Sequence, residues 1–96
     1  MRVISKKPIR EFWERHPESK PALEEWFRKV GQLGATSFPE LRHVFRSADY
    51  VDGYTLFDVG GNKHRIATVI HYDKQRLYVR QVMTYAEYDR NAWRKK

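Results

Sequence analysis

The chain has 96 residues, of which 41% are hydrophobic and 15% aromatic, and it contains no cysteine. This length and composition suit one globular domain over residues 1–96; they exclude a disordered chain, and the missing cysteines exclude disulfides and thiolate metal sites. No apolar run approaches the roughly 18 residues of a membrane span, and early basic residues interrupt any signal-peptide pattern, so we expect a soluble cytoplasmic protein without membrane contact. The formal charge of +7 favours a polyanionic partner, either a nucleic acid or an acidic protein.

The first half of the chain predicts a short strand over residues 1–4 and then two aromatic-rich helices. The first helix is capped by Ser5 and stops at Pro17. The second begins around residues 19–21 and ends near two glycines. Apolar side chains recur at helical spacing in both, so we expect these helices to cover one face of a sheet. A capping-box pattern at residues 37–40 predicts a third, short helix.

The second half predicts four strands and a closing helix. Asp52-Gly53 favours a two-residue type I′ hairpin turn. Three segments rich in β-branched and aromatic residues follow as strands, separated by Gly60-Gly61-Asn62 and by a four-residue loop. A second capping box over residues 84–87 carries the last strand directly into a helix. The predicted strands after the hairpin are residues 54–59, 64–72 and 77–84.

Pairing across the four-residue loop at residues 73–76 places Tyr72 opposite Leu77 and Ile66 opposite Met83, on one mostly apolar face. The opposite face is then left open. By parity it carries Asp58, Arg65, Ala67, Val69, His71, Tyr78, Arg80, Val82 and Thr84. The predicted fold is therefore α+β, with helices on one face of a small, mainly antiparallel sheet and a short C-terminal helix.

The open face suits a phosphodiester. Arg65 and Arg80 offer planar, permanently charged donors to phosphate oxygens. RNA supplies its own nucleophile, the 2′-hydroxyl, so a ribonuclease needs only a base, an acid and cations for the transition state. Lys63, His71 and Tyr85 are the titratable candidates. Aromatic rings that can stack on bases are His71, Tyr78 and Tyr88, and we group them with Lys63 as candidate RNA-binding residues.

Simpler interpretations stay open. Asp58 and Arg65 can form an ordinary cross-strand ion pair. The four histidines lack the spacing of a metal site, and His64 and His71 fall on opposite faces of the sheet, so no metal or other cofactor is expected. Gly60-Gly61 opens a strand and not a helix, which does not fit a phosphate-binding loop.

Three stretches resemble one protein family over nearly the whole chain: MRVISKKPIREFWERHP, FPELRHVFRSADYV and FDVGGNKHRIATVIHYDKQRLYVRQVMTYAEYD. The specific elements are GGNK-x-R, DKQR-x-Y-x-R and T-x-x-EYD. They resemble the HigB toxins, mRNA interferases of type II toxin–antitoxin modules in the RelE-like superfamily. The resemblance implies a metal-independent endoribonuclease on a RelE-like fold that cleaves mRNA, in many relatives on the translating ribosome.

The resemblance further implies a HigA-type helix-turn-helix antitoxin as partner, with operator DNA bound only through the antitoxin complex. Carried onto this chain, it makes Arg65, Arg80 and Tyr85 the catalytic residues and Lys63 an auxiliary cation. The family pattern has histidine where this chain has Tyr85, and asparagine where it has Asp58, so a weakened or inactive toxin is one alternative. A non-catalytic RNA- or ribosome-binding protein, and a module that only docks an acidic antitoxin segment, are two others.

Overall fold

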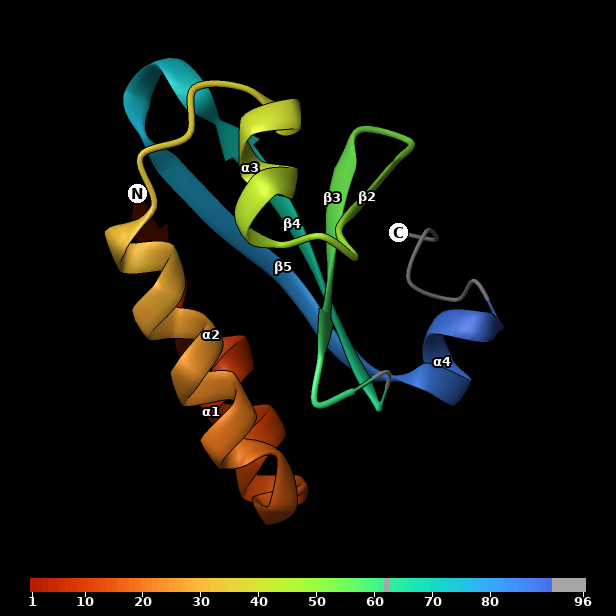
Figure 1. Ribbon diagram of the computed structural model, residues 1–96. Helices are drawn as coiled ribbons and strands as arrows, with labels where there is room; N and C mark the ends of the chain where they lie inside the picture. The colour runs from red at the N-terminus through yellow and green to blue at the C-terminus, as the bar shows by residue number, and fades with distance from the viewer. Residues whose placement is uncertain (62, 91–96) are drawn as a thin grey trace.

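The computed structural model describes residues 1–61 and 63–90. Two helices lie across one face of a five-stranded sheet, and a short helix lies at the far side (Figure 1). Predictions for Asn62 and for the C-terminal residues from 91 onward, Trp93 included, fall outside the described residues. In chain order the elements are β1 (Arg2–Ile4), α1 (Lys7–Arg15), η1 (Pro17–Ser19), α2 (Lys20–Gln32), α3 (Phe38–Val44), β2 (Asp49–Val51), β3 (Tyr54–Val59), β4 (His64–His71), η2 (Tyr72–Lys74), β5 (Arg76–Thr84) and α4 (Tyr85–Asp89).

The sheet has the strand order β1-β5-β4-β3-β2. Strand β1 pairs with β5 in parallel, and the other neighbours pair antiparallel. The α+β architecture with a mainly antiparallel sheet is thereby confirmed. Among the described helices, none is long and apolar enough to cross a membrane.

The helices α1 and α2 pack on the sheet through one continuous core. Its helical part includes Ile9 and Phe12 of α1 and Leu23, Trp26 and Val30 of α2, all at most 3% exposed. The sheet contributes the buried side chains Phe57, Val59, Ile66, Leu77, Val79 and Val82. The prediction that two aromatic-rich helices cover the apolar face is confirmed.

The β2–β3 hairpin turns at Asp52-Gly53, as predicted. Asp52 has φ 53° and Gly53 has φ 85°, which are the two positive values that a type I′ turn requires. Val51 pairs with Tyr54 across it. The hairpin therefore fixes where β3 begins, and with it the direction of every side chain on that strand.

The predicted register between β4 and β5 is wrong by two residues from the turn to Thr68 and by one residue beyond it. His71 pairs with Arg76, so the connection is residues 72–75 and not residues 73–76. A 3₁₀ turn over Tyr72–Lys74 ends in Gln75, whose φ is 54°, and the Gln75 amide donates to the carbonyl oxygens of Ala35 and Tyr72 at 2.8 and 2.9 Å. These hydrogen bonds stabilise a compact turn that strand propensity does not indicate.

Strand β5 contains a β-bulge at Arg80. Thr68 pairs with Val79, but the next residue of β4, Ala67, pairs with Gln81, so Arg80 is one residue in excess of the ladder. A bulge of this kind reverses the alternation of side chains beyond it. Val82, predicted on the open face, is therefore in the main core, and Met83, predicted in the main core, lies on the opposite face.

The face opposite α1 and α2 is not entirely open, which corrects the prediction. Leu56, Ala67 and Met83 form a second small cluster there, and Val51, Tyr54 and Tyr88 pack against it. Tyr88 comes from α4, which lies on this side of the sheet (Figure 1). The bulge is the physical reason, because it turns the large apolar side chain of Met83 toward α4.

Two of the three predicted helix caps are confirmed, and α2 starts within the predicted residues 19–21. For α4, Thr84 accepts a hydrogen bond from the Glu87 N–H and the Glu87 carboxylate accepts one from the Thr84 N–H, which completes the capping box. For α3, Ser37 accepts from the Glu40 N–H at 3.3 Å. The cap predicted at Ser5 is wrong: the N-cap of α1 is Lys6, without a side-chain hydrogen bond.

Candidate functional site

The candidate residues lie on the sheet face opposite α1 and α2, in two separate groups. The first, the helix-end cluster, is where α4 meets the sheet. The second, the strand groove, is a shallow groove nearer the β4–β5 turn. The helix-end cluster contains Asp58, Lys63, Arg65, Tyr85 and Tyr88, and the strand groove is lined by Val69, His71, Tyr78 and Arg80.

Arg65 is the centre of the helix-end cluster. It is paired with Asp58 of the neighbouring strand in the antiparallel register, and its guanidinium forms an ion pair with the Asp58 carboxylate. The two side chains are only 16% and 14% exposed. An ion pair so far removed from water is stronger than the exposed cross-strand pair considered from sequence. Arg65 is thus a largely buried cation with a fixed anion beside it.

Two tyrosine rings of α4 cover the Arg65 guanidinium. Its Cζ atom lies 5.2 Å from the ring centre of Tyr85 and 5.0 Å from that of Tyr88. Residues three apart on a helix share a face, which is why both rings reach the same cation. The interactions are cation–π contacts and hold α4 onto the sheet. Tyr85 stays 47% exposed, so its hydroxyl-bearing ring is available to a ligand.

The first turn of α4 is also held by its backbone. The Tyr85 N–H donates to the Lys63 carbonyl oxygen at 3.1 Å. Lys63 is exposed and directly precedes β4, after Gly60 and Gly61 at φ 68° and 62°. The main chains of Lys63 and Tyr85 are therefore adjacent, as the proposal of a shared chemical role requires.

The strand groove combines two aromatic rings with one arginine. The rings of His71 and Tyr78 have centroids 5.2 Å apart at an interplanar angle of 59°. Arg80 is exposed at the bulge and lines the same groove. The extra residue bends the strand and directs this arginine out of the regular ladder. The groove places two rings that can stack on bases beside an arginine that can donate hydrogen bonds to a phosphate.

The two groups lie at different points along β5, the strand groove at Tyr78 and Arg80 and the helix-end cluster where β5 passes into α4. Arg80 precedes Tyr85 by five residues, so their Cα atoms are at most about 17 Å apart at 3.3 Å per residue. A single-stranded nucleic acid can contact both groups at once, because its repeating phosphates and bases extend over such a distance.

His64 lies on the other side of the sheet from His71, as predicted. It is 6% exposed, and its ring meets that of Phe12 edge to face at a centroid distance of 5.3 Å. Its Nδ1 atom has no hydrogen-bond partner among the described residues. Burial lowers the pKa of His64 from its ordinary value, because it disfavours the charged form of the ring. We therefore exclude His64 from the candidate chemistry.

Sequence reasoning missed two features of the site. It did not indicate that Tyr88 is a second cover for Arg65, although the i, i+3 spacing with Tyr85 carried that information. It also placed Arg80 in a regular strand, because no residue pattern marks a bulge. The described residues contain no group of three or more His, Cys, Asp or Glu side chains with the arrangement of a metal site.

Comparison with known proteins decides the family. Residues 19–91 match the model of a family described as HigB_toxin, the RelE-like toxic component of a toxin–antitoxin system. This chain belongs to the HigB toxin family. The matched residues include β3, β4, β5 and α4, which build both groups described above.

Curated relatives support the same assignment. The chain is 34% identical over 93 residues to the mRNA interferase toxin HigB of Escherichia coli strain K12, covering 93% of this chain and 88% of that protein. It is 30% identical over 93 residues to the mRNA interferase HigB of Escherichia coli O6:H1, covering 94% and 90%. A HigB of Shigella flexneri, also named an mRNA interferase, is 34% identical with 93% and 88% covered.

Proposed function

We propose that this HigB family member is an endoribonuclease toxin that cuts mRNA on the sheet face bearing Arg80, Arg65 and Tyr85. The observation that carries the proposal is Tyr85, which is held by the backbone of Lys63 and by the Arg65 guanidinium and yet remains 47% exposed. A fixed, accessible phenol beside cations is what proton transfer at a phosphodiester needs.

The proposed reaction uses the substrate's own nucleophile. The 2′-hydroxyl oxygen attacks the adjacent phosphorus while a base removes its proton. The bond from phosphorus to the 5′-oxygen of the next nucleotide breaks, and an acid protonates that oxygen. The products are a 2′,3′-cyclic phosphate and a free 5′-hydroxyl. No external electron donor or acceptor enters, and the charge that grows on the phosphoryl oxygens is the quantity the protein must stabilise.

Tyr85 is proposed as the residue that transfers a proton. Its phenolic hydroxyl can donate a proton to the leaving 5′-oxygen, so Tyr85 is proposed as the acid. Lys63, whose carbonyl oxygen accepts a hydrogen bond from the Tyr85 N–H, is the proposed auxiliary cation. The identity of the base is left open between Lys63 and a second role of Tyr85, because His71 lies in the strand groove, away from Tyr85.

The two arginines are proposed to contribute unequally. Arg80 is exposed and donates to phosphate oxygens of the bound strand. Arg65 lies behind Tyr85, and the Asp58 carboxylate balances part of its charge. Its contribution is therefore a local positive potential at Tyr85 more than a direct grip on phosphate. This division follows from exposure, since a cation at 16% exposure meets few ligand atoms.

The strand groove is proposed to hold nucleotides away from the cut. His71 and Tyr78 stack on bases, Arg80 binds the connecting phosphate, and Tyr88 supports the strand near α4. Because stacking tolerates every base, the groove should bind single-stranded RNA without selecting a particular codon. An mRNA threaded through the ribosome presents such a strand, and the charge of +7 favours contact with ribosomal RNA.

The proposed partners follow from the toxin–antitoxin family. They are mRNA, the translating ribosome and a HigA-type helix-turn-helix antitoxin, with operator DNA reached only through the antitoxin complex. The proposed location of action is the cytoplasm, where translating ribosomes are found.

Primer extension on a reporter mRNA tests the cleavage proposal. The toxin is induced in cells and, separately, incubated as purified protein with the transcript. Discrete cuts are expected for the wild type, none for Arg80→Ala, and a strong reduction for Tyr85→Phe, which keeps the ring and loses only the hydroxyl. Arg46→Ala, at an exposed arginine after α3, is the matched control and should cut normally.

The outcome against the proposal is equally definite. If folded protein arrests growth but produces no cuts in either setting, the fold acts as a binding module and the chemical roles given to Tyr85 and the arginines are wrong. If Tyr85→Phe cuts at the wild-type rate, cleavage stands and the proton-transfer role must move to another residue.

A further inference from the structure

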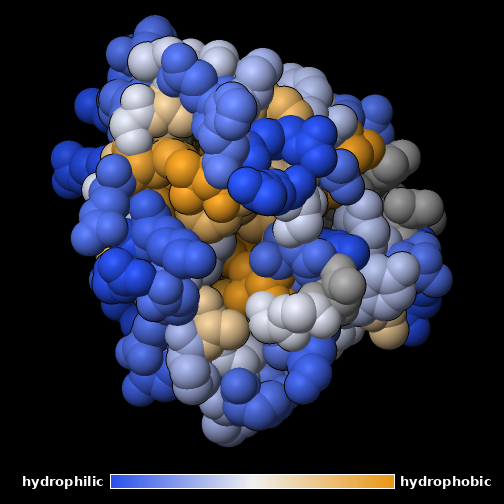
Figure 2. Space-filling view, in the orientation of Figure 1, coloured by the Kyte–Doolittle hydropathy of each residue, from blue (hydrophilic) through white to orange (hydrophobic). Residues whose placement is uncertain are grey.

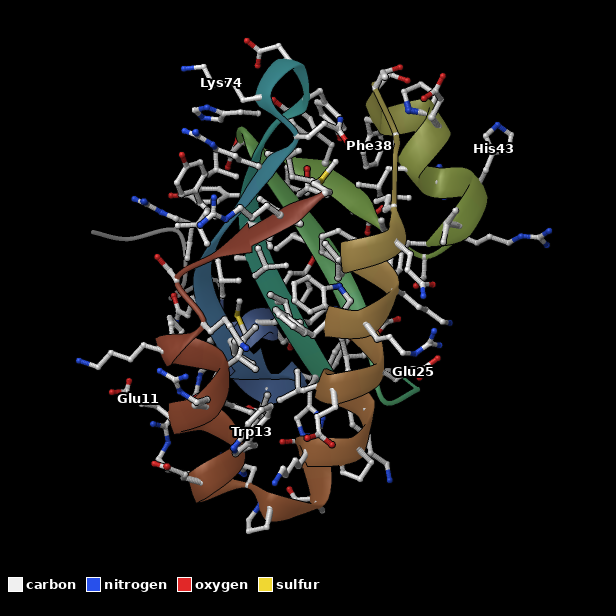
Figure 3. The ribbon with its side chains drawn as sticks, turned by 90° about the vertical axis from the view of Figure 1, so that its left-hand side faces the viewer. Glu11, Trp13, Glu25, Phe38, His43 and Lys74 are labelled. Atoms are coloured by element: carbon white, nitrogen blue, oxygen red, sulfur yellow. The ribbon has the colours of Figure 1, made fainter. Side chains whose placement is uncertain are left out.

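The helices α1 and α2 enclose a groove on their outer side, on the opposite side of the molecule from the candidate site. Its volume is about 270 Å³, enough for one or two side chains of a partner. Figure 3 shows Trp13 between the two helices at this position. The floor is apolar and the rim is charged; the lining residues are Lys6, Ile9, Arg10, Trp13, Glu24 and Phe27.

Two lysines lie over the aromatic rings of this groove. The Lys6 ammonium is 4.3 Å from the centre of the Phe27 ring, and the Lys20 ammonium is 5.4 Å from that of Trp13. Both rings are half-buried. A mobile lysine head is a weak cover for an aromatic face, because it gives at most about 1 kcal/mol at an exposed site and moves aside easily. These ring faces are thus ready to receive an apolar side chain.

The rim has an excess of positive charge. The rim and its immediate surroundings contain three cations, Lys6, Arg10 and Lys20, and one anion, Glu24. Among the described residues, neither Lys6 nor Arg10 forms an ion pair. The nearby pair of Lys7 with Glu11 satisfies a different lysine. A segment bearing carboxylates next to an apolar side chain is the chemistry that complements such a rim.

A second hollow, between α2 and α3, differs in its charge. It is lined by Trp26, Phe45 and Val59, and Figure 2 shows apolar surface in this region between α2 and β3. The acidic residues at its edge, Glu25 and Asp58, are paired with Arg28 and Arg65. Lys29 remains as the cation on this hollow. Its mixed edge gives no comparable preference for an acidic partner.

We propose that the α1–α2 groove is the docking site of this toxin's antitoxin, which inserts an apolar side chain flanked by Asp or Glu. The proposal rests on membership of a toxin–antitoxin family and not on the residues proposed to cut RNA. Aromatic and cationic side chains in one enclosed pocket are typical of the few residues that dominate a protein–protein interface. An anchor of this size forms part of a larger interface, since stable complexes bury about 800 Å² on each partner.

The position of the groove gives the proposal a functional meaning. The helices that form it cover the face of the sheet opposite the helix-end cluster and the strand groove (Figure 1). An antitoxin anchored there holds the toxin without occupying the RNA-binding residues with its anchor. Variants of the groove should therefore separate neutralisation from toxicity.

The binding experiment uses the full chain with Arg80→Ala to permit expression, titrated with the purified antitoxin of the same system in a calorimeter. Lys6→Glu/Arg10→Glu is expected to weaken binding at least about tenfold and to remove most of its salt dependence. Lys29→Glu, at the second hollow, should bind as the parent does. Thermal unfolding of each variant confirms the fold, which charge reversals at exposed positions should leave intact.

In cells, Lys6→Glu/Arg10→Glu in the otherwise unaltered toxin is expected to arrest growth even when the antitoxin is co-expressed. Unchanged antitoxin affinity of the double variant overturns the proposal, and so does a loss that appears with Lys29→Glu instead. A double variant that loses affinity for a single-stranded RNA while it binds antitoxin normally assigns the groove to nucleic acid and also overturns it. If no variant or wild type arrests growth, the cleavage proposal fails while the calorimetric result still stands.

Discussion

Replacing Arg65 by alanine should destabilise the whole domain, whatever it does to catalysis. The substitution removes the cation from the Asp58 carboxylate, which is 14% exposed, and the guanidinium from beneath two tyrosine rings. Breaking a buried pair costs about 3–5 kcal/mol, and the remaining exposure here reduces that to about 2–3 kcal/mol. Each cation–π contact adds about 0.5–1 kcal/mol. The expected loss is therefore about 3–5 kcal/mol.

That loss is large beside the total stability. A domain of 96 residues has a free energy of unfolding of about 5–14 kcal/mol, at 0.05–0.15 kcal/mol per residue. At about 4–8 °C per kcal/mol, the melting temperature of Arg65→Ala should fall by at least about 12 °C. Thermal unfolding followed by circular dichroism measures this fall, with Arg80→Ala as the matched control. Because Arg80 is exposed, its removal should change the stability by no more than about 0.5 kcal/mol.

A double-mutant cycle locates the energy. Asp58→Ala, Arg65→Ala and the double variant should show a coupling of more than about 1 kcal/mol, because the two side chains are in direct contact. If Arg65→Ala has the melting temperature of the wild type, the ion pair and the two tyrosine rings do not hold α4 on the sheet. The division of labour between the arginines would then be refuted. A coupling near zero with a low melting temperature would assign the loss to the tyrosine contacts alone.

Two further predictions concern His64 and the α4 cap. Burial lowers the pKa of His64, so protons bind the unfolded chain more readily than the folded one. The contribution of neutral His64 to the free energy of unfolding is therefore fully present above the ordinary histidine pKa of 6.5 and is lost as the pH falls below it. Urea unfolding at pH 7.5 and 5.5 should show a larger fall in the free energy of unfolding for the wild type than for His64→Leu. Equal falls would contradict the assignment. Thr84→Ala removes the hydroxyl that accepts a hydrogen bond from the Glu87 N–H at 3.2 Å, and it should lower the free energy of unfolding by about 0.5–2 kcal/mol. It should also slow RNA cleavage, because Tyr85 is the first residue of the helix that Thr84 caps. Thr84→Ser restores the cap and should restore both, and a cleavage rate insensitive to either substitution would separate α4 from the chemistry.

Much of the architecture is encoded in local patterns. The Asp52-Gly53 turn and the capping box at Thr84 each rest on a few neighbouring residues with a direct backbone consequence. The alternation of side chains also assigned Arg65, His71 and Tyr78 to the face opposite the helices. These features were predictable because the interactions that determine them are short in sequence.

The features that depended on distant contacts were not predictable. Gln75 holds the β4–β5 turn by donating a hydrogen bond to the carbonyl oxygen of Ala35, which is 40 residues away in sequence. The turn that this contact stabilises gives β4 and β5 a different register from the predicted one. The bulge at Arg80 is set by pairing with β4, and it exchanged the faces of Val82 and Met83. The division of the candidate site into two groups follows from that bulge and from the packing of α4, so a list of residues on one face did not contain it.

The buried positions of β5 do not depend on the extra residue at the bulge. Without Arg80 the order inward, outward, inward would run unbroken from Leu77 through Val79 to Val82, and every buried side chain of β5 would keep its side. A one-residue deletion at this point is thus gentler on the core than the same deletion anywhere else in the strand. Deleting Arg80 should therefore remove an exposed phosphate-binding cation while the buried side chains of β5 keep their places in the core.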